Sequence, residues 1–109
     1  MGLIGSSCTI DSTSTSSSLA IQKAYEALKA GDCDYAIVSG GILSLLSQTS
    51  YQLLELGLLS KDGVNKSFDK NASGFSRSES IGTIFLQRAK YAKRVYAEII
   101  NLCPNFRLL

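Results

Sequence analysis

The chain has 109 residues, of which 45% are hydrophobic, and its formal net charge is +2. This length allows one domain with a core of its own, but not two. Its eleven Lys and Arg residues are spread along the chain, which argues against a nucleic-acid-binding surface. No apolar stretch approaches the roughly 20 residues that span a bilayer. The start of the chain lacks the features of a signal peptide, so we expect a cytoplasmic protein.

The first predicted elements are a strand, a helix and a second strand. Residues 6–11 read as a short strand, and a helical period of apolar residues begins near Ser16. Gly31 is placed to end that helix. Residues 34–41 form a continuous apolar run typical of a strand buried on both faces of a sheet. This order predicts a right-handed parallel crossover.

A second helix is predicted over residues 47–60. Ser47 or Thr49 is expected to cap its N-terminus, and Gly57 lies near its end. Its leucines are expected to be buried. These are Leu53, Leu54 and Leu56.

Two further strands are predicted after a long polar loop. The loop spans residues 61–79, and loops of this length in compact domains are usually functional or disordered. Residues 80–87 and 94–102 read as strands, and residues 88–93 between them fit one helical turn. The predicted fold class is therefore α/β, without internal repeats.

The three cysteines, Cys8, Cys33 and Cys103, are odd in number and widely spaced, and the chain has no histidine. A disulfide framework is poorly supported by this pattern, and so is a metal site. We expect Cys8 to be a small buried core residue.

Seven consecutive Ser and Thr residues, 12–18, lie where the first predicted strand meets the first helix. A strand, a sharp turn and a helix can form a nucleophile elbow. The N-terminus of a helix has unpaired N–H groups and a partial positive charge, which suit an anion or an activated nucleophile. Alternatively, these hydroxyls only cap the helix.

The run IDSTSTSSSLAIQKAYEALKAGDCDYAIVSGG resembles the segment of β-ketoacyl synthases that usually reads Asp-Thr-Ala-Cys-Ser-Ser-Ser-Leu, followed by a helix and an apolar strand ending in Gly-Gly. LGLLSKDGVNKSFDKNASGFSRSES resembles a later run of the same family. FLQRAKYAKRVYAEIIN is similar to the version in animal, particularly insect-type, fatty acid synthases, and related polyketide synthases belong to the same group. The resemblance covers about residues 3–101, whereas residues 102–109 diverge.

This resemblance implies part of a thiolase-like fold, in which two similar α/β halves pack together and two subunits pair. Residues 1–109 would then be part of a β-ketoacyl synthase N-terminal domain. In the family, a cysteine at the elbow accepts an acyl chain, and two histidines help to decarboxylate a malonyl unit that attacks it. The substrates are phosphopantetheine thioesters on acyl carrier protein. The implied partners are therefore acyl carrier protein and a second ketosynthase subunit, and no cofactor is implied.

The nucleophile position is degenerate in this chain. Counting back from SSSL places it at Thr15, and counting forward from Asp11 places it at Ser14. An alcohol ionises about seven pKa units above a thiol, roughly 10 kcal/mol, and a helix terminus supplies at most about 2 kcal/mol. The resemblance places both histidines beyond residue 109. We therefore expect no intact catalytic residue, an inactive chain, and hydroxyls that serve as helix caps.

Other residues around the site are expected to have structural roles. Asp11 is expected to tie down the elbow through backbone N–H groups, with Ser16 beside it. Gly40 and Gly41 permit close backbone approach or positive φ. Phe75, together with Phe68, is expected to anchor the long loop to the core.

Arg77 and Glu79 match the family's Arg-x-Glu, and two interpretations of them stay open. They form either an ion pair that fixes the loop beside the elbow or an isolated solvated pair. Lys90, Lys93 and Arg94 form a small basic group that suits an acidic carrier protein, although a solvated face is the favoured interpretation.

Two function classes follow from the sequence. The chain is either part of a condensing enzyme of fatty acid or polyketide synthesis, or a non-catalytic binding or dimerising module derived from a ketosynthase.

Overall fold

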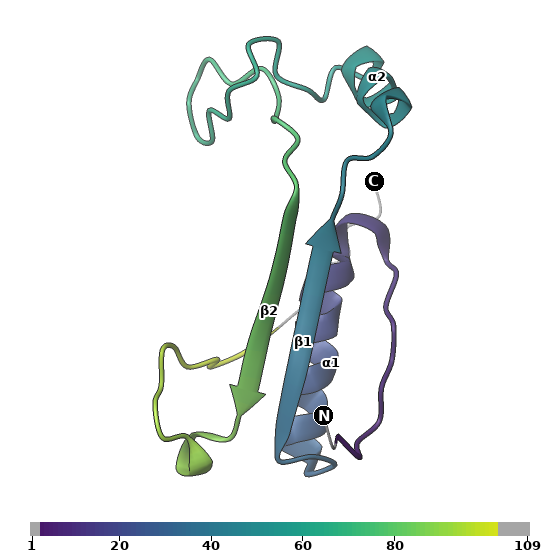
Figure 1. The fold of residues 1–109 in the computed structure, drawn as a ribbon. Coiled ribbons are helices and arrows are strands. Elements are labelled where there is room, and N and C mark those ends of the chain that lie inside the picture. Colours follow the sequence, from purple (N-terminus) through teal and green to yellow (C-terminus); the bar gives the residue numbers. More distant parts are fainter. Residues whose placement is uncertain (1–2, 103–109) are drawn as a thin grey trace. The chain divides into compact units, whose positions relative to one another are not determined.

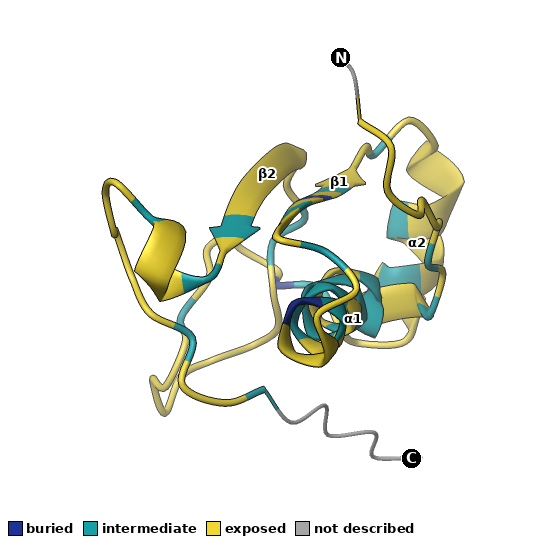
Figure 2. Cartoon of the chain, turned by 90° about the horizontal axis from the view of Figure 1, so that it is seen from below, coloured by how far each residue is buried: buried dark blue, intermediate teal, exposed yellow. Residues whose placement is uncertain are grey.

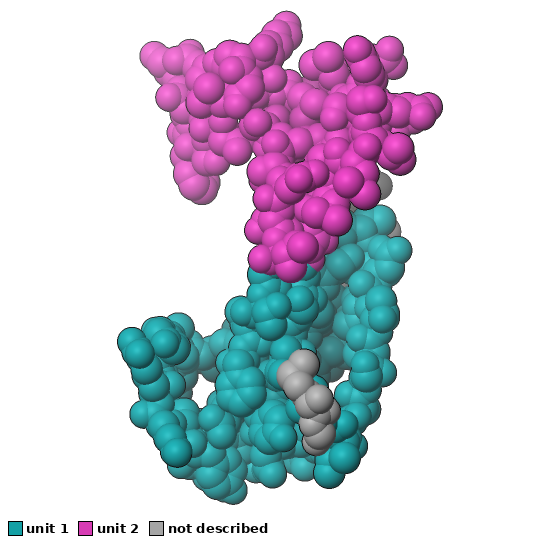
Figure 3. All heavy atoms as spheres, viewed as in Figure 1, with its two compact units in different colours: residues 1–40, 82–109 teal, residues 41–81 magenta. Residues whose placement is uncertain are grey.

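The computed structural model describes residues 3–102 (Figure 1). The chain divides into two compact units, one formed by Met1–Gly40 with Gly82–Leu109 and the other by Gly41–Ile81 (Figure 3). Each unit is described by itself below. Across the described residues, no helix is long and apolar enough to cross a membrane.

Helix α1, Ser16–Ala30, is the main element of the first unit. It begins at the residue that the helical period predicts, directly after a short 3-10 turn, η1, over Thr13–Thr15. The predicted end at Gly31 is confirmed, because this glycine has a φ of 93° and lies in the left-handed region. Just beyond it, the N–H of Asp32 donates to the carbonyl of Ala27, which satisfies one of the last carbonyls of the helix.

Arg88 holds the C-terminal end of α1. Its Nε and Nη2 both donate to the carbonyl oxygen of Leu28, at 3.1 and 2.8 Å. A guanidinium at this end also interacts favourably with the helix dipole. The sequence pattern did not indicate this contact, because the two residues are 60 positions apart and meet only through the fold.

Strands β1, Tyr35–Ile42, and β2, Ser80–Gln87, form a two-stranded sheet and run in opposite directions (Figure 1). The predicted strand over 80–87 is confirmed, and the strand predicted over 34–41 is shifted by one residue. In the first unit, the hydroxyls of Ser39 and Thr83 lie 2.9 Å apart. The rings of Tyr35 and Phe85 stack with their centroids 5.7 Å apart.

The prediction that the strand over 34–41 is buried on both faces is wrong. Only Val38 of β1 is buried, and the single other buried apolar residue among residues 3–102 is Leu28 of α1 (Figure 2). Tyr35 and Ile37 are each 47% exposed. The physical reason is that α1 covers one side of β1, and no described element of the first unit covers the side that carries Tyr35 and Ile37.

The strand predicted over residues 6–11 is also wrong, as is the one over 94–102. Both segments are irregular in the structure. A strand needs a neighbour to pair its N–H and C=O groups, and neither segment has one among residues 3–102. The predicted parallel crossover is therefore incomplete, although residues 3–12 run in the same direction as β1 (Figure 1). The turn predicted within 88–93 is confirmed as a 3-10 turn, η2, over Ala89–Tyr91.

In the second unit, helix α2 spans Ser47–Glu55, shorter than the predicted 47–60. Its N-cap is Leu46 rather than Ser47 or Thr49, so that prediction is wrong. Gly57 does end the helix, with a φ of 69°. The N–H of Leu58 donates to the carbonyl of Leu53 and the N–H of Gly57 to that of Leu54, which is a Schellman motif.

The leucines of α2 are not buried as predicted. Leu54 is 49% and Leu56 71% exposed, and only Leu53 is half-buried. The helix has one apolar side, but no other described helix or strand of this unit packs on it. Periodicity therefore identifies the side that would enter a core without showing that a core is present.

The predicted long loop is confirmed between α2 and β2. Its regular feature is a parallel bridge between Leu59 and Phe75. Gly74 makes this bridge possible: its φ is 136°, and a Cβ on it would lie 2.5 Å from the carbonyl carbon of Leu59. Ser60, beside the bridge, is buried.

Candidate functional site: the hydroxyl-rich elbow

The elbow is the turn that leads from residues 3–12 into α1, and one carbonyl organises it. The carbonyl oxygen of Ser12 accepts hydrogen bonds from the hydroxyls of Thr13 and Thr15, at 2.8 and 2.9 Å. It also accepts one from the N–H of Thr15, at 3.3 Å. The Ser12 and Thr15 hydroxyls lie 3.0 Å apart. The hydroxyls of Ser12, Thr13 and Thr15 therefore form their hydrogen bonds within the turn itself.

Thr13 has a strained backbone. Its φ is 54°, which β-branched residues rarely adopt. The Oδ1 of Asp11 accepts a hydrogen bond from the N–H of Thr13 at 3.2 Å, so the carboxylate contacts the turn at its sharpest point. The sequence indicated a sharp turn here but not which residue carries the strain.

Ser16, the first residue of α1, links the turn to the helix. Its Oγ accepts a hydrogen bond from the N–H of Ser12 at 2.9 Å and donates one to the carbonyl of Thr13 at 2.7 Å. Thr15 is the N-cap residue, but its side chain makes no capping hydrogen bond. The expectation that the hydroxyls cap the helix is wrong at this position, because the 3-10 turn directs the Thr15 hydroxyl back to Ser12.

The two nucleophile candidates differ in exposure. Ser14 is exposed, whereas Thr15 is half-buried. Thr15 directly precedes α1, where the helix has N–H groups without intrahelical partners. The 3-10 turn Thr13–Thr15 lies directly before α1, so both candidate positions belong to this turn.

The first turn of α1 lies against β1 at Gly40. A Cβ on this glycine would be 2.6 Å from the Oγ of Ser17. Its neighbour Gly41 belongs to the second unit, where a Cβ would be 3.2 Å from Cγ1 of Ile81. Both positions therefore require glycine because neighbouring atoms approach closely, and not because the backbone has a positive φ. Sequence reasoning did not find Ser17, since a serine in a run of seven hydroxyl residues carries no distinguishing signal.

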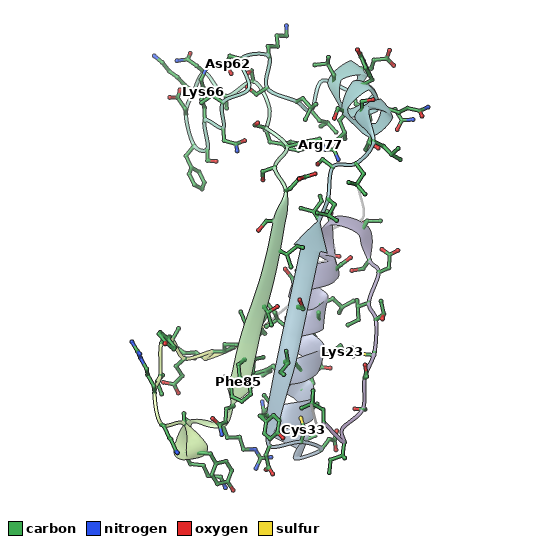
Figure 4. The ribbon with its side chains drawn as sticks, in the orientation of Figure 1. Lys23, Cys33, Asp62, Lys66, Arg77 and Phe85 are labelled. Carbon is green, nitrogen blue, oxygen red and sulfur yellow. The ribbon has the colours of Figure 1, made fainter. Side chains whose placement is uncertain are left out.

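No described cysteine lies at the elbow. Cys8 is exposed in the irregular segment 3–12, so its predicted burial is wrong, because no neighbouring strand covers that segment. Cys33 follows the C-terminal end of α1 (Figure 4), and a helix of 15 residues is about 22 Å long. Cys103 lies outside the described residues. Residues 3–102 also contain no group of histidine, cysteine or acidic residues that would hold a metal ion.

Arg77 and Glu79 belong to the second unit and bind other partners instead of each other, so both alternatives, the ion pair that fixes the loop and the isolated solvated pair, are wrong. Nη1 of Arg77 donates to the Oγ of Ser50 at 2.7 Å (Figure 4). Oε1 of Glu79 accepts a hydrogen bond from the N–H of Ser44 at 2.8 Å. Each side chain therefore fixes a different part of the segment around α2.

The two phenylalanines of the loop behave differently. Phe75 is held by its backbone, since its N–H donates to Leu58 and its carbonyl accepts from Ser60. Its side chain is 46% exposed, and Phe68 is fully exposed with a φ of 65°. The prediction that they anchor the loop to a core is wrong for Phe68, because the second unit buries no large side chain on which it would pack.

Comparison with known proteins identifies the family. The chain matches the N-terminal domain of the β-ketoacyl synthases over residues 1–92. It belongs to this family. The ketosynthase fold is thiolase-like, and the α/β elements α1, β1 and β2 are a part of it.

Similar ketosynthases occur in both fatty acid and polyketide synthases. A fatty acid synthase of the goose Anser anser anser is 42% identical over 101 residues, which cover 93% of this chain and 29% of that protein. A highly reducing polyketide synthase of the fungus Glarea lozoyensis is 44% identical over 92 residues, 84% of this chain and 4% of that protein. The chain thus spans less than a third of either relative.

Solved ketosynthase structures are similar to this chain over most of its length. The oxazolomycin ketosynthase domain of Streptomyces albus is 32% identical with a TM-score of 0.73, over 80% of this chain and 16% of that one. The ketosynthase from module 6 of the bacillaene synthase of Bacillus subtilis is 37% identical with a TM-score of 0.67, over 70% and 14%. The family match over residues 1–92 includes α1 and β1, so the elbow can be interpreted within this family.

Proposed function

We propose that this chain is the elbow-bearing segment of a β-ketoacyl synthase and that its elbow has lost the acyl-accepting thiol. The complete domain would condense an acyl-cysteine with a malonyl unit in fatty acid or polyketide synthesis. The observation that carries the proposal is that Thr15, a hydroxyl residue, lies directly before α1. In the proposal, residue 15 occupies the place of the family's cysteine. The match to the family supports the first part, and the chain's own residues support the second.

The chemistry explains why the chain by itself would be inactive. A hydroxyl at this position needs a general base to become a nucleophile, and the chain has no histidine. The Thr15 hydroxyl already donates to the carbonyl of Ser12, at 2.9 Å. Partial charge at the start of α1 does not offset the roughly 10 kcal/mol that separates an alcohol from a thiol.

Its substrates and partners would be those of the family. These are acyl and malonyl groups carried as phosphopantetheine thioesters on acyl carrier protein, and a second ketosynthase subunit, in the cytoplasm. The family relationship to fatty acid and polyketide synthases supports this assignment.

The residues around the elbow would then have structural roles. Asp11 and Ser16 hold the turn through the hydrogen bonds described above. The absence of a side chain at Gly40 lets Ser17 of α1 approach β1 closely, and its absence at Gly41 does the same for Ile81 of β2. Phe75, Arg77 and Glu79 shape the long loop of the second unit.

The test is a condensation assay with the purified chain. It is incubated with an acyl thioester and a malonyl thioester, and the 3-ketoacyl product is measured by mass spectrometry. We expect no product above the rate without protein. Product that depends on the chain, and that disappears in a Thr15→Ala or Ser14→Ala variant, would overturn the proposal.

A non-catalytic association module is the second candidate. The apolar side of the sheet away from α1 favours it, because Tyr35 and Ile37 are each 47% exposed and Phe85 is 59% exposed. Exposed apolar surface of this kind marks interaction sites or aggregation. A Phe85→Ser variant that remains helical by circular dichroism, but self-associates as strongly as the natural chain, would rule out this side as the contact.

A further inference from the structure

We propose that Gly40 is a positioning residue for the elbow, because the absence of a side chain there lets Ser17 approach β1 and so sets where residue 15 lies. This inference rests on the proposed function, in which residue 15 occupies the place of the family's nucleophile. It adds a role for a strand residue that contacts the elbow only through the helix.

The requirement at Gly40 is for space rather than for backbone freedom. Its φ is not positive, so an alanine could adopt the same conformation. An added Cβ, however, would be 2.6 Å from Oγ of Ser17, 3.3 Å from its Cβ and 4.0 Å from its Cα. Rotation of the hydroxyl would relieve the first contact. The second involves an atom that is fixed by the helix backbone, so relieving it requires the first turn of α1 and β1 to move apart by a few tenths of an ångström.

The other end of α1 cannot easily follow such a movement. Arg88 holds the carbonyl of Leu28 with two hydrogen bonds, near the C-terminus of the helix. An added methyl group at residue 40 therefore acts on a helix that is fixed at its far end. Its first turn would be displaced from the sheet together with residue 15, which is two positions before Ser17.

A thiol at residue 15 reports this displacement. The Thr15→Cys variant places a thiol at the start of α1, where the helix terminus favours the thiolate and lowers its pKa. The rate of alkylation by iodoacetamide is measured between pH 5 and pH 10. We then expect Gly40→Ala to raise the apparent pKa of the thiol and to slow alkylation at pH 7 about twofold or more.

Two sets of variants separate positioning from general damage. Gly82→Ala adds the same methyl group to β2, where nothing lies within 4 Å, and should leave the profile unchanged. Combined with Gly40→Ala, Ser17→Ala should restore the profile in part and Ser17→Gly more fully. This order is expected because Ser17→Ala removes only the Oγ at 2.6 Å, whereas Ser17→Gly also removes the Cβ at 3.3 Å. Circular dichroism monitors the helicity of α1 in each variant.

An unchanged profile in a helical Gly40→Ala variant would overturn the inference. Equal shifts in the Gly40→Ala and Gly82→Ala variants would do the same, as would failure of Ser17→Gly to restore the profile. If Gly40→Ala unfolds α1, recovery of both helix and profile in the double variant supports the inference, and no recovery overturns it. These profiles do not require acyl transfer, so condensation by the natural chain would contradict the proposed function without altering them.

Discussion

Thr13 has a strained backbone in the turn before α1. Its φ of 54° is unfavourable for a β-branched side chain. Thr13→Gly should therefore stabilise the start of α1 by about 0.5 to 1 kcal/mol, measured as the free energy of local opening from hydrogen exchange. Ser14→Gly, at a residue whose φ is not positive, should weaken it, and equal effects would show that Thr13 is unstrained.

Residue 15, rather than residue 14, is expected to hold the nucleophile's place. Thr15 directly precedes α1, and a shift of the helix by one residue would rotate its packed side by about 100°. In separate Thr15→Cys and Ser14→Cys variants, the thiol at 15 should therefore be alkylated at lower pH. A lower apparent pKa of the thiol at residue 14, or equal alkylation profiles in the two variants, would contradict the assignment of residue 15 that counting back from SSSL gives.

Single residues were predicted well where one position decides the backbone, as at Gly31 and Gly57. The hydroxyls of residues 12–18 were not, because a serine or threonine can bond to the helix or back to the turn. Which of these occurs depends on the conformation of Thr13. Similarly, Arg77 and Glu79 have partners 27 and 35 residues away, and local sequence carries no information about such contacts.

Among the elements, the long loop of the second unit depends most on a glycine. At Gly74 an added Cβ would be within 2.6 Å of backbone atoms of Leu58, Leu59 and Ser60. Gly74→Ala should therefore destabilise the Leu59–Phe75 bridge by about 2 kcal/mol or more. Gly63→Ala is the control, because Gly63 also has positive φ but open space around it. Equal changes of hydrogen exchange in the Gly74→Ala and Gly63→Ala variants would contradict the role of backbone crowding at Gly74.

The same loop should respond to acid through Asp62. Its carboxylate accepts hydrogen bonds from Lys66 (Figure 4), from the hydroxyl of Ser60 and from the N–H of Val64. These hydrogen bonds, most of all the one from Lys66, lower the pKa of Asp62 below its ordinary value. Because the pKa of Asp62 is lower in the folded chain than in the unfolded chain, its ionised carboxylate stabilises the fold at any pH above the unfolded pKa of about 3.9. This stabilisation is lost as the pH falls below that value.

Hydrogen exchange around Ser60, corrected for its intrinsic pH dependence, should therefore show protection that is constant from pH 7 to about pH 4 and declines below. Asp62→Asn should lower the protection at pH 7 and flatten this decline. A decline of the same size in the variant would assign the acid response to another group.

Elements were predicted best where they are local. The 3.6-residue period located α1, and the apolar runs located β1 and β2, because these signals lie within each segment. The strands predicted over 6–11 and 94–102 failed because a strand is stable only beside a partner. Sequence indicates the propensity of a segment, but not whether the neighbouring strand is present.

For the whole molecule, the small core has a direct consequence. Among the described residues, only Leu28 and Val38 are buried apolar residues, whereas Tyr35, Ile37 and Phe85 of the sheet are about half exposed. Exposed apolar strands associate with one another. The purified chain should therefore form oligomers or aggregates, or remain loosely packed. A sharply melting monomer in sedimentation and calorimetry would contradict this.

Mass spectrometry can show whether the elbow of this ketosynthase chain has lost its acyl-accepting thiol. The natural chain and its Thr15→Cys variant are incubated with the same acyl thioester, digested and mapped. We expect an acyl group on residue 15 of the variant and no adduct at the elbow of the natural chain. A stable acyl adduct on Ser14 or Thr15 of the natural chain would contradict this expectation.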